Sequence, residues 1–493
     1  MSSVSKDPKT LSEKQRKLLK LLLGRGGIGL KQTARMRRQK PNAQLPLSFA
    51  QQRLWFLDRL VPDSPFYNLP SAFRLRAPLV QAPINEQAVR AALNEIVRRH
   101  EVLRTSFGEE GGKPFLVVSP SLEVPFEVRD LRHLDPATRD RESLRLATED
   151  AQLPFDLRRG PFLRASLLRL GELDYVFLMS MHHIVADAWS TGVFVEEYKQ
   201  LYTAFSQGLP SPLPELEIQY ADFAIWQRNR LAAGELHPQL RYWTKKLANL
   251  PQLELPTDFP HRDIQGFEGE TQYVPLPAQL SQDVQAFSLR NDVTLFATLF
   301  AVFNALLYRY TGQDEIVIGE PVANRTRAEL EPLIGFFVNS LVLRTDVSGD
   351  PTFRELLRRS WQEALAALDN QDIPFEVIVE RLKPERSMGR NPLFQVSLQF
   401  YSGADAQSHT GVVPSEIINV EKGTASLDLA FDFFKSRQGI LLRVEYSTEL
   451  FRRETIRRII SHYQNLLTAF IENPELRLSE APMLSTEELP QVL

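Results

Sequence analysis

The stretch DYVFLMSMHHIVADAWSTGVFVEEYKQLYTAF (174–205) contains the features that decide the fold. Residues 174–181 are apolar on both faces, which is typical of a strand buried in the middle of a sheet. The preceding segment 162–170 predicts a second strand, joined to the first in a hairpin through Gly171 and Glu172. Residues 189–205 predict a helix. A buried strand that leads into a helix indicates an α/β core.

Two adjacent histidines, His182 and His183, stand where this strand ends, and Asp187 and Ser190 follow them. Neighbouring strand residues point to opposite faces, so one histidine can face a cavity while the other packs inside. The turn can bring Asp187 behind His183, or aim it at an arginine that fixes the loop. A purely structural histidine pair is the alternative. A metal site would need a third ligand, and no other residue pair stands in an obvious ligand spacing.

Outward from this segment, strong helices alternate with apolar strands over the whole chain, and the predicted elements include helices at 294–312 and 453–471 and a strand at 341–347. A Pro-rich stretch, 208–216, is the best candidate for a linker between two lobes. The predicted organisation is therefore two α/β lobes. The expected boundaries are a leader at 1–44, an N-terminal lobe at 45–207, a C-terminal lobe at 208–480 and an exit linker at 481–493.

The leader predicts a short basic amphipathic helix over its leucines from Leu11 to Leu23. A docking or inter-domain segment is one interpretation, and a helix on a membrane surface is the other. No stretch approaches the roughly 20 apolar residues of a membrane span, and the N-terminus is not a secretory signal. We therefore expect a cytoplasmic protein.

Composition excludes several classes of function. The 493 residues include 58 Lys and Arg against 61 Asp and Glu, and this balance argues against general nucleic-acid binding. The chain has no cysteine, which removes a thiol nucleophile, a thiolate zinc site and any disulfide. No phosphate-binding glycine loop or nucleophile elbow is present, so nucleotide-dependent activation is not expected.

Seven segments, taken in order, resemble the condensation domains of nonribosomal peptide synthetases over essentially Leu45 to Glu480. The segments are SFAQQRLWFL (48–57), RHEVLRTSF (99–107), MHHIVADAWS (181–190), YADFAIWQ (220–227), IGEPVANRTRAELEPLIGFFVNSLVLR (318–344), DNQDIPFEVIVERL (369–382) and RSMGRNPLFQVSLQF (386–400). The first of them and YNLP (67–70) look most like the subtype that accepts a donor ending in an L-residue.

The resemblance implies two lobes, each similar to chloramphenicol acetyltransferase, arranged as a V with a tunnel between them. It also implies an amide-forming reaction, in which an acceptor α-amine attacks a donor thioester. Both substrates would arrive as phosphopantetheine thioesters on an upstream donor and a downstream acceptor carrier protein, next to an adenylation domain. The chain itself would bind no cofactor or metal.

By the same resemblance, His183 is the active-site residue and His182 supports it. Asp187 is expected in a structural salt bridge with Arg104, and Trp226 and Asn339 match positions near the tunnel. Ser190 and Ala188 belong to the candidate tunnel side by their place in the motif. A thioester is already activated, so His183 would only need to orient the amine, accept its proton or stabilise the intermediate.

One departure from the family motif is Ala188, which stands where the motif has glycine. Tolerated drift is one interpretation, and a narrowed channel for the acceptor arm is the other. Three alternative functions also stay open: a starter domain that takes a fatty acyl donor, a non-catalytic recruitment platform, and a free-standing acyltransferase that uses coenzyme A.

Overall fold

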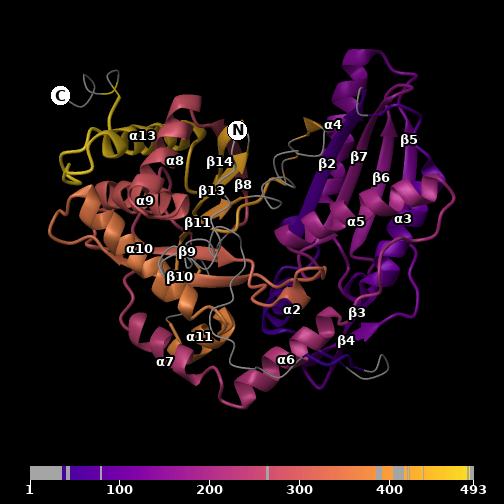
Figure 1. Cartoon of the computed structure of the whole chain (residues 1–493), viewed down its shortest axis with the longest axis horizontal. Helices are drawn as coiled ribbons and strands as arrows, with labels where there is room; N and C mark the ends of the chain where they lie inside the picture. The colour runs from indigo at the N-terminus through magenta and orange to yellow at the C-terminus, as the bar shows by residue number, and fades with distance from the viewer. Residues whose placement is uncertain are drawn as a thin grey trace, which may run out of the picture.

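The structure is a computed structural model that describes residues 36–39, 45–77, 80–262, 266–384, 391–402, 416–418, 420, 422–436, 438–485 and 488. Figure 1 shows two lobes of mixed helix and sheet, one of early and one of late residues, that approach each other near α2 and α6. The two lobes agree with the sequence-based prediction. The predicted leader helix lies outside the described residues.

The first lobe is built on a five-stranded sheet with the order β12-β2-β7-β6-β5. Its strands from this lobe are β2 (Asn68–Arg76), β5 (Phe126–Asp130), β6 (Leu163–Arg169) and β7 (Asp174–His182). Strands β6 and β7 form the predicted antiparallel hairpin. Strand β7 is buried from Tyr175 to His182, because α3 (Glu86–Arg99) and α5 (Ala188–Ser206) cover one face of the sheet and α4 (Pro136–Gln152) covers the other.

A small sheet and several short elements complete this lobe. The sheet has the order β1-β4-β3, with β1 (Leu45–Pro46), β3 (Thr105–Glu110) and β4 (Lys113–Val118). Helix α2 (Phe49–Leu60) starts at the capping box formed by Ser48 and Gln51. Two 3-10 turns, η2 (Pro65–Tyr67) and η3 (Glu101–Arg104), precede β2 and β3.

The second lobe carries a six-stranded sheet with the order β10-β9-β11-β13-β14-β8. Its strands are β8 (Gly269–Pro275), β9 (Glu315–Val322), β10 (Asn339–Asp346), β11 (Val396–Tyr401), β13 (Leu429–Ser436) and β14 (Gly439–Ser447). Its remaining elements are α6 (Tyr220–Ala232), α7 (His237–Lys246), α8 (Ala278–Arg290), α9 (Leu295–Thr311), η4 (Ala328–Leu330), α10 (Phe353–Asp369), α11 (Phe375–Leu382) and α13 (Arg453–Glu472).

The central strands of this sheet have one face on helices and one face turned away from them. Phe431 of β13 lies 4.7 Å, between ring centroids, from Phe303 of α9, and Phe433 lies 5.5 Å from Tyr463 of α13. The opposite residues of β11, β13, β14 and β8 form aligned rows, and we call this surface the inter-lobe face. Its rows are Ser397-Ala430-Glu445-Thr271, Gln399-Asp432-Arg443-Tyr273 and Tyr401-Phe434-Leu441-Pro275.

Later segments of the chain pack into the first lobe. Strand β12 (Glu416–Ile417) pairs antiparallel with the edge strand β2, and Figure 1 shows it beside that sheet. Residues 218–223 and 330–337 contribute to the core that lies under α3 and α5. The predicted boundary at 207/208 stays a prediction, but the second lobe contacts the first through more than one segment.

Helix length and hydropathy bear on the predicted absence of a membrane span. In the described ranges, no single helix is long and apolar enough to cross a bilayer. Helices α8 and α9 reach that length and hydropathy only as a pair, and they meet at a bend of 107°. Most of α9 is buried in the second core.

Candidate active site

The histidine pair lies at the junction of β7 and α5. Strand β7 ends at His182, and α5 begins at Ala188 with Asp187 as its N-cap. The Asp187 side chain accepts a hydrogen bond of 2.8 Å from the backbone N–H of Ser190, as a helix-capping aspartate does. Within residues 181–187, only His183 is partly exposed.

His182 is enclosed by aromatic rings. The rings of Tyr67, Phe155 and Phe162 lie 6.0–6.3 Å from the imidazole, between centroids. Its Nδ1 accepts a hydrogen bond of 3.1 Å from the backbone N–H of Ile184. Burial lowers the pKa of His182 to about 3, so the ring is neutral at physiological pH. The arrangement gives His182 a packing role in support of the turn.

His183 has the geometry of a neutral base. Its Nδ1 lies 2.8 Å from the backbone oxygen of Ala186, and a carbonyl only accepts, so Nδ1 carries the proton. Nε2 is then left with its lone pair. The Phe336 ring packs against the imidazole in an edge-to-face arrangement, with 4.7 Å between the ring centroids. Burial lowers the pKa of His183, which keeps the imidazole uncharged and able to accept a proton.

Asp187 forms a buried ion pair with Arg325, not with Arg104. Arg325 Nη1 donates to Asp187 Oδ2 over 2.9 Å, and Nη2 donates to Oδ1 over 3.1 Å. The backbone N–H of Phe337 also donates to Oδ2. Burial alone would raise the pKa of Asp187, but the charge and hydrogen bonds of Arg325 outweigh it and hold this pKa below its usual value. Asp187 thus fastens the histidine turn to residues 325–337.

The predicted pairing of Asp187 with Arg104 is therefore wrong. Arg104 ends η3, and its guanidinium donates to the backbone oxygen of Ser119 and, over 3.5 Å, to Glu101. These partners hold the start of β3 against β4. Both oxygens of Asp187 are already bonded to Arg325, so the ion pair that the resemblance implied exists with a different arginine.

The other predicted residues occupy three different places. Ser190 is fully buried, and its hydroxyl donates to Asp187 and accepts from the backbone N–H of Gly335, so it belongs to the Asp187 network. Ala188 packs against the inter-lobe face at Tyr401 and Phe434. Its methyl group therefore occupies space between the lobes.

Trp226 and Asn339 make their contacts elsewhere. The guanidinium groups of Arg230 and Arg327 lie 4.7 and 5.7 Å from the centroid of the Trp226 ring in α6. Asn339 uses its amide to hold the start of α11, by donating to the backbone oxygen of Ile373 and accepting from the backbone N–H of Phe375. Both residues stabilise the local chain in these positions.

Comparison with known proteins gives the family. The model of the family described as "Condensation domain" matches residues 42–493. The chain belongs to the condensation-domain family. Condensation domains form amide bonds in nonribosomal peptide synthetases, and the sequence-based predictions of family, fold and reaction are confirmed at this level. The starter and recruitment alternatives are not favoured, and the L-donor subtype stays a prediction.

Relatives and solved structures agree with this assignment. A linear gramicidin synthase of Brevibacillus parabrevis is 45% identical over 91% of this chain, which spans 6% of that protein. Phosphinothricin tripeptide synthetase PhsC of Streptomyces viridochromogenes is 38% identical over 97% of this chain and 44% of its own length. The X-domain from teicoplanin biosynthesis superposes with a TM-score of 0.81 at 26% identity, over 92% of this chain and all of that one. The condensation domain thus spans only a small part of the gramicidin synthases that it matches.

Two residues of this condensation domain were missed as site residues. Arg325 lies in the motif segment 318–344, where no spacing rule links it to Asp187. Gln51 of α2 is fully buried, and its amide donates over 3.0 Å to the backbone oxygen of Ile184, within the histidine turn. Its spacing of three residues from Leu54, on the face of α2 that is buried, was the available signal, because a buried amide needs partners.

Contacts around Tyr220 complete the support of the turn. The Tyr220 hydroxyl donates to the backbone oxygen of Phe336 and lies 2.8 Å from the Ser48 hydroxyl. Gly335 is required beside this ring, because a Cβ there would lie 2.0 Å from Tyr220. Three of the quoted motifs therefore meet next to the turn that carries the histidine pair.

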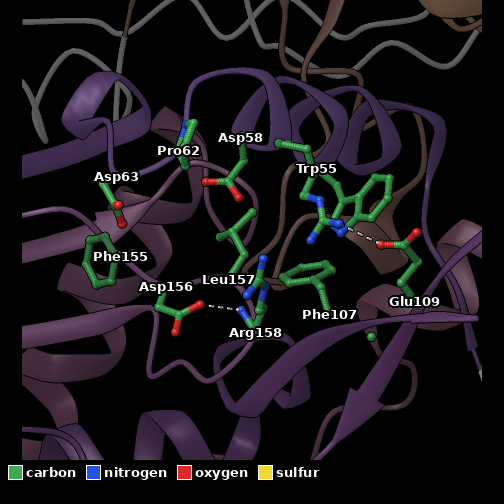
Figure 2. A pocket seen from close by; sticks show the side chains of 12 residues that line it. Trp55, Asp58, Pro62, Asp63, Phe107, Glu109, Phe155, Asp156, Leu157 and Arg158 are labelled. Atoms are coloured by element: carbon green, nitrogen blue, oxygen red, sulfur yellow. Dashed lines mark hydrogen bonds and ion pairs between the residues drawn. The ribbon is translucent and has the colours of Figure 1, made fainter. Parts of the chain in front are cut away.

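A pocket of about 450 Å³ is lined by Phe155, one of the aromatic residues around His182. Figure 2 shows Phe107, Phe155 and Leu157 on its walls, with the carboxylates of Asp58 and Asp156 around them. Burial raises the pKa of Asp58, and the negative charges of Asp156 and Asp63 raise it further. Phe155 also packs on the His182 ring, so the same side chain forms part of the pocket wall and supports the histidine pair.

No metal centre is found among the described residues, where no group of three His, Asp or Glu side chains is placed to hold an ion. The two histidines cannot serve together in this arrangement, because Nδ1 of His182 accepts from Ile184 and its Nε2 carries the proton, so only Nε2 of His183 has a free lone pair. The chemistry available at this site is that of a neutral imidazole.

Proposed function

We propose that this condensation domain joins two carrier-bound substrates, with His183 as the residue that handles the proton. The acceptor α-amine attacks the donor thioester carbonyl, so that a C–N bond forms and the C–S bond breaks. Nε2 of His183 accepts the proton lost by the amine and passes it to the departing pantetheine sulfur, which leaves as a thiol while the imidazole returns to its neutral form. The free Nε2 on a partly exposed ring is the observation that carries this proposal.

The partners follow from this chemistry. The proposed donors and acceptors are phosphopantetheine thioesters on an upstream and a downstream carrier protein, with an adenylation domain adjacent. We propose that these arms meet at His183 in a passage between the lobes. No cofactor would be bound by the chain itself. The cytoplasmic location and the L-type donor remain predictions of the same proposal.

A condensation assay tests the proposal. A donor carrier loaded with an aminoacyl thioester is mixed with a loaded acceptor carrier, and intact-protein mass spectrometry follows the donor mass. We expect transfer to the acceptor with wild type and a loss of about 10²–10⁴-fold in rate with His183→Ala. His133→Ala is the matched control, because His133 is exposed in the first lobe. Near-normal transfer by His183→Ala, in a folded protein, would contradict the role of His183. Transfer only from fatty acyl donors would identify a starter domain instead.

A further inference from the structure

Asn68 begins strand β2 directly opposite His182 of β7, on the same face of the sheet. The two residues are register partners in the antiparallel pair of β2 and β7. The backbone N–H of His183 donates over 2.8 Å to the backbone oxygen of Tyr67, so residues 67 and 183 form a hydrogen-bonded pair of this ladder. Asn68 and His182 are then a non-hydrogen-bonded pair, the kind with the closer side chains, with about 4.5–5.5 Å between Cβ atoms.

The Asn68 side chain is fully buried, and its amide nitrogen holds the end of α4. Nδ2 donates over 2.7 Å to the backbone oxygen of Ala151 and over 2.9 Å to that of Leu153. Because carbonyl groups only accept, these two bonds fix which end of the amide is the nitrogen. The other end, Oδ1, has no hydrogen-bond donor among the described residues. A buried amide oxygen needs a donor, so this atom calls for a partner.

His182 carries the complementary group. Its Nδ1 accepts over 3.1 Å from the backbone N–H of Ile184, so Nδ1 has no proton and the neutral ring carries its proton on Nε2. Nε2 donates no hydrogen bond within the described part of the chain, although His182 is only 2% exposed. The strand pair therefore places a donor without an acceptor beside an acceptor without a donor.

The other neighbours of the His182 ring are aromatic. The rings of Tyr67, Phe155 and Phe162 lie 6.0–6.3 Å from it, between centroids. A polar group enclosed by apolar surface costs free energy unless it is hydrogen-bonded. One water molecule between the two side chains would accept from Nε2–H of His182 and donate to Oδ1 of Asn68. Buried water molecules make about two to four such bonds, so these two groups are enough to hold one.

We infer that Asn68 is a positioning residue for the histidine pair, and that its Oδ1 and the Nε2–H of His182 share one bound water molecule. The N–H of Ile184 and this water bind the two opposite nitrogens of the ring, and both require the same tautomer. Asn68 thereby helps to hold the ring where Nδ1 fixes Ile184, the residue next to His183. The effect of Asn68 on the reaction rests on the proposed function, whereas the water site does not.

A crystal structure of the wild-type chain tests the water site directly. We expect one peak of water density within about 2.7–3.2 Å of both Asn68 Oδ1 and His182 Nε2. Nitrogen NMR of protein with ¹⁵N-labelled histidine, in which His182→Gln assigns the signals, should show a proton on Nε2 of His182 and none on Nδ1. A proton on Nδ1 would overturn the inference, and so would an Nε2–H directed at the Phe155 ring with no water at Asn68.

Two variants separate the water link from the support of α4. Asn68→Asp and Asn68→Leu both lose the bonds donated to Ala151 and Leu153, but only aspartate keeps an acceptor oxygen in the place of Oδ1. In the condensation assay, we expect Asn68→Leu to lower kcat by about 2- to 10-fold, the range of one neutral hydrogen bond, and Asn68→Asp to keep more of the rate. Asn229→Leu is the matched control, because Asn229 is exposed on α6.

The pH profile gives a readout that support of α4 alone would not change. A carboxylate at position 68 favours the charged form of His182, in which Nδ1 is protonated and cannot accept from Ile184. Asn68→Asp should therefore lose its activity at a higher pH than wild type as the solution is acidified. Asn68→Leu should show no such shift.

Equal losses of rate in Asn68→Asp and Asn68→Leu, with unchanged pH profiles, would mean that Asn68 acts only by holding α4, and the inference would fall. If neither variant folds, the water density and the NMR signals of wild type decide. A wild type that is inactive with every substrate would contradict the proposed function, while the same two measurements would still decide whether Asn68 and His182 share a water molecule.

Discussion

The buried pair of Asp187 and Arg325 gives the sharpest quantitative prediction. Asp187 accepts five hydrogen bonds from described residues, and two of them come from Arg325. Arg325→Met keeps much of the side-chain volume but leaves a buried carboxylate without its cation, which typically costs about 3–5 kcal/mol. The remaining bonds from Ser190 and Phe337 place the expected loss at the lower end of that range.

A double-mutant cycle measures the pair itself. The free energy of unfolding is obtained from urea titrations of wild type, Asp187→Asn, Arg325→Met and the double variant. We expect a coupling energy of about 2–3 kcal/mol between positions 187 and 325. The same cycle with Arg104→Met should give less than about 0.5 kcal/mol, as for residues that share no partner. A larger coupling with Arg104 than with Arg325 would refute the assignment. If Arg325→Met does not fold, Arg325→Lys replaces it in the double-mutant cycle.

Three further predictions concern the histidine turn. Because His182 has a pKa of about 3 when folded and about 6.5 when unfolded, the unfolded state binds one more proton between these pH values. The free energy of unfolding should therefore fall by up to about 1.4 kcal/mol for each unit by which the pH is lowered through this range. His182→Gln should flatten the dependence of the urea midpoint on pH, and an unchanged slope would argue against a neutral buried ring. Gln51→Leu removes the hydrogen bond to Ile184, so the condensation rate should fall about tenfold and the free energy of unfolding by about 1–3 kcal/mol. Gln52→Leu, on the exposed side of α2, should keep the wild-type rate in the same assay. Ala188→Gly removes the methyl group that packs on Tyr401 and weakens the first turn of α5, so the free energy of unfolding should drop by about 0.5–1 kcal/mol. A large gain in the condensation rate of this variant would show instead that Ala188 narrows the channel.

The sequence predicted those parts of the fold that depend on local periodicity. Helix 294–312 is observed as Leu295–Thr311, and the final helix 453–471 as Arg453–Glu472. Strand 341–347 is observed as Asn339–Asp346. Each of these segments has an apolar pattern that only one type of element satisfies. The hairpin around Gly171 was predictable for the same reason, since two apolar runs flank a short polar turn.

The site was predictable only where its residues are close together in the chain. His182, His183 and Asp187 share one turn, so their proximity follows from sequence. The partner of Asp187 is 138 residues away, and many arginines could have filled that role until the fold selected Arg325. The same holds for Gln51, which is 133 residues from the carbonyl that it supports. Long-range pairing is set by tertiary packing, which no local pattern encodes.

These long-range contacts also constrain how the two lobes can move. The turn that holds His183 is fastened to the second-lobe segment 325–337 through Asp187. Strand β12, from late in the chain, is attached to the first sheet by its pairing with β2. Among the contacts between the lobes in the described residues, these two lie at separate places. Opening at the first place would leave Asp187 buried without its cation, whereas opening at the second breaks only the short β12 pairing and the backbone bonds around it. A motion that admits substrate should therefore pivot about Asp187 and loosen β12, so amide hydrogen exchange should be faster at Ile418 than at Phe337. Faster exchange at Phe337 would place the hinge at the other end.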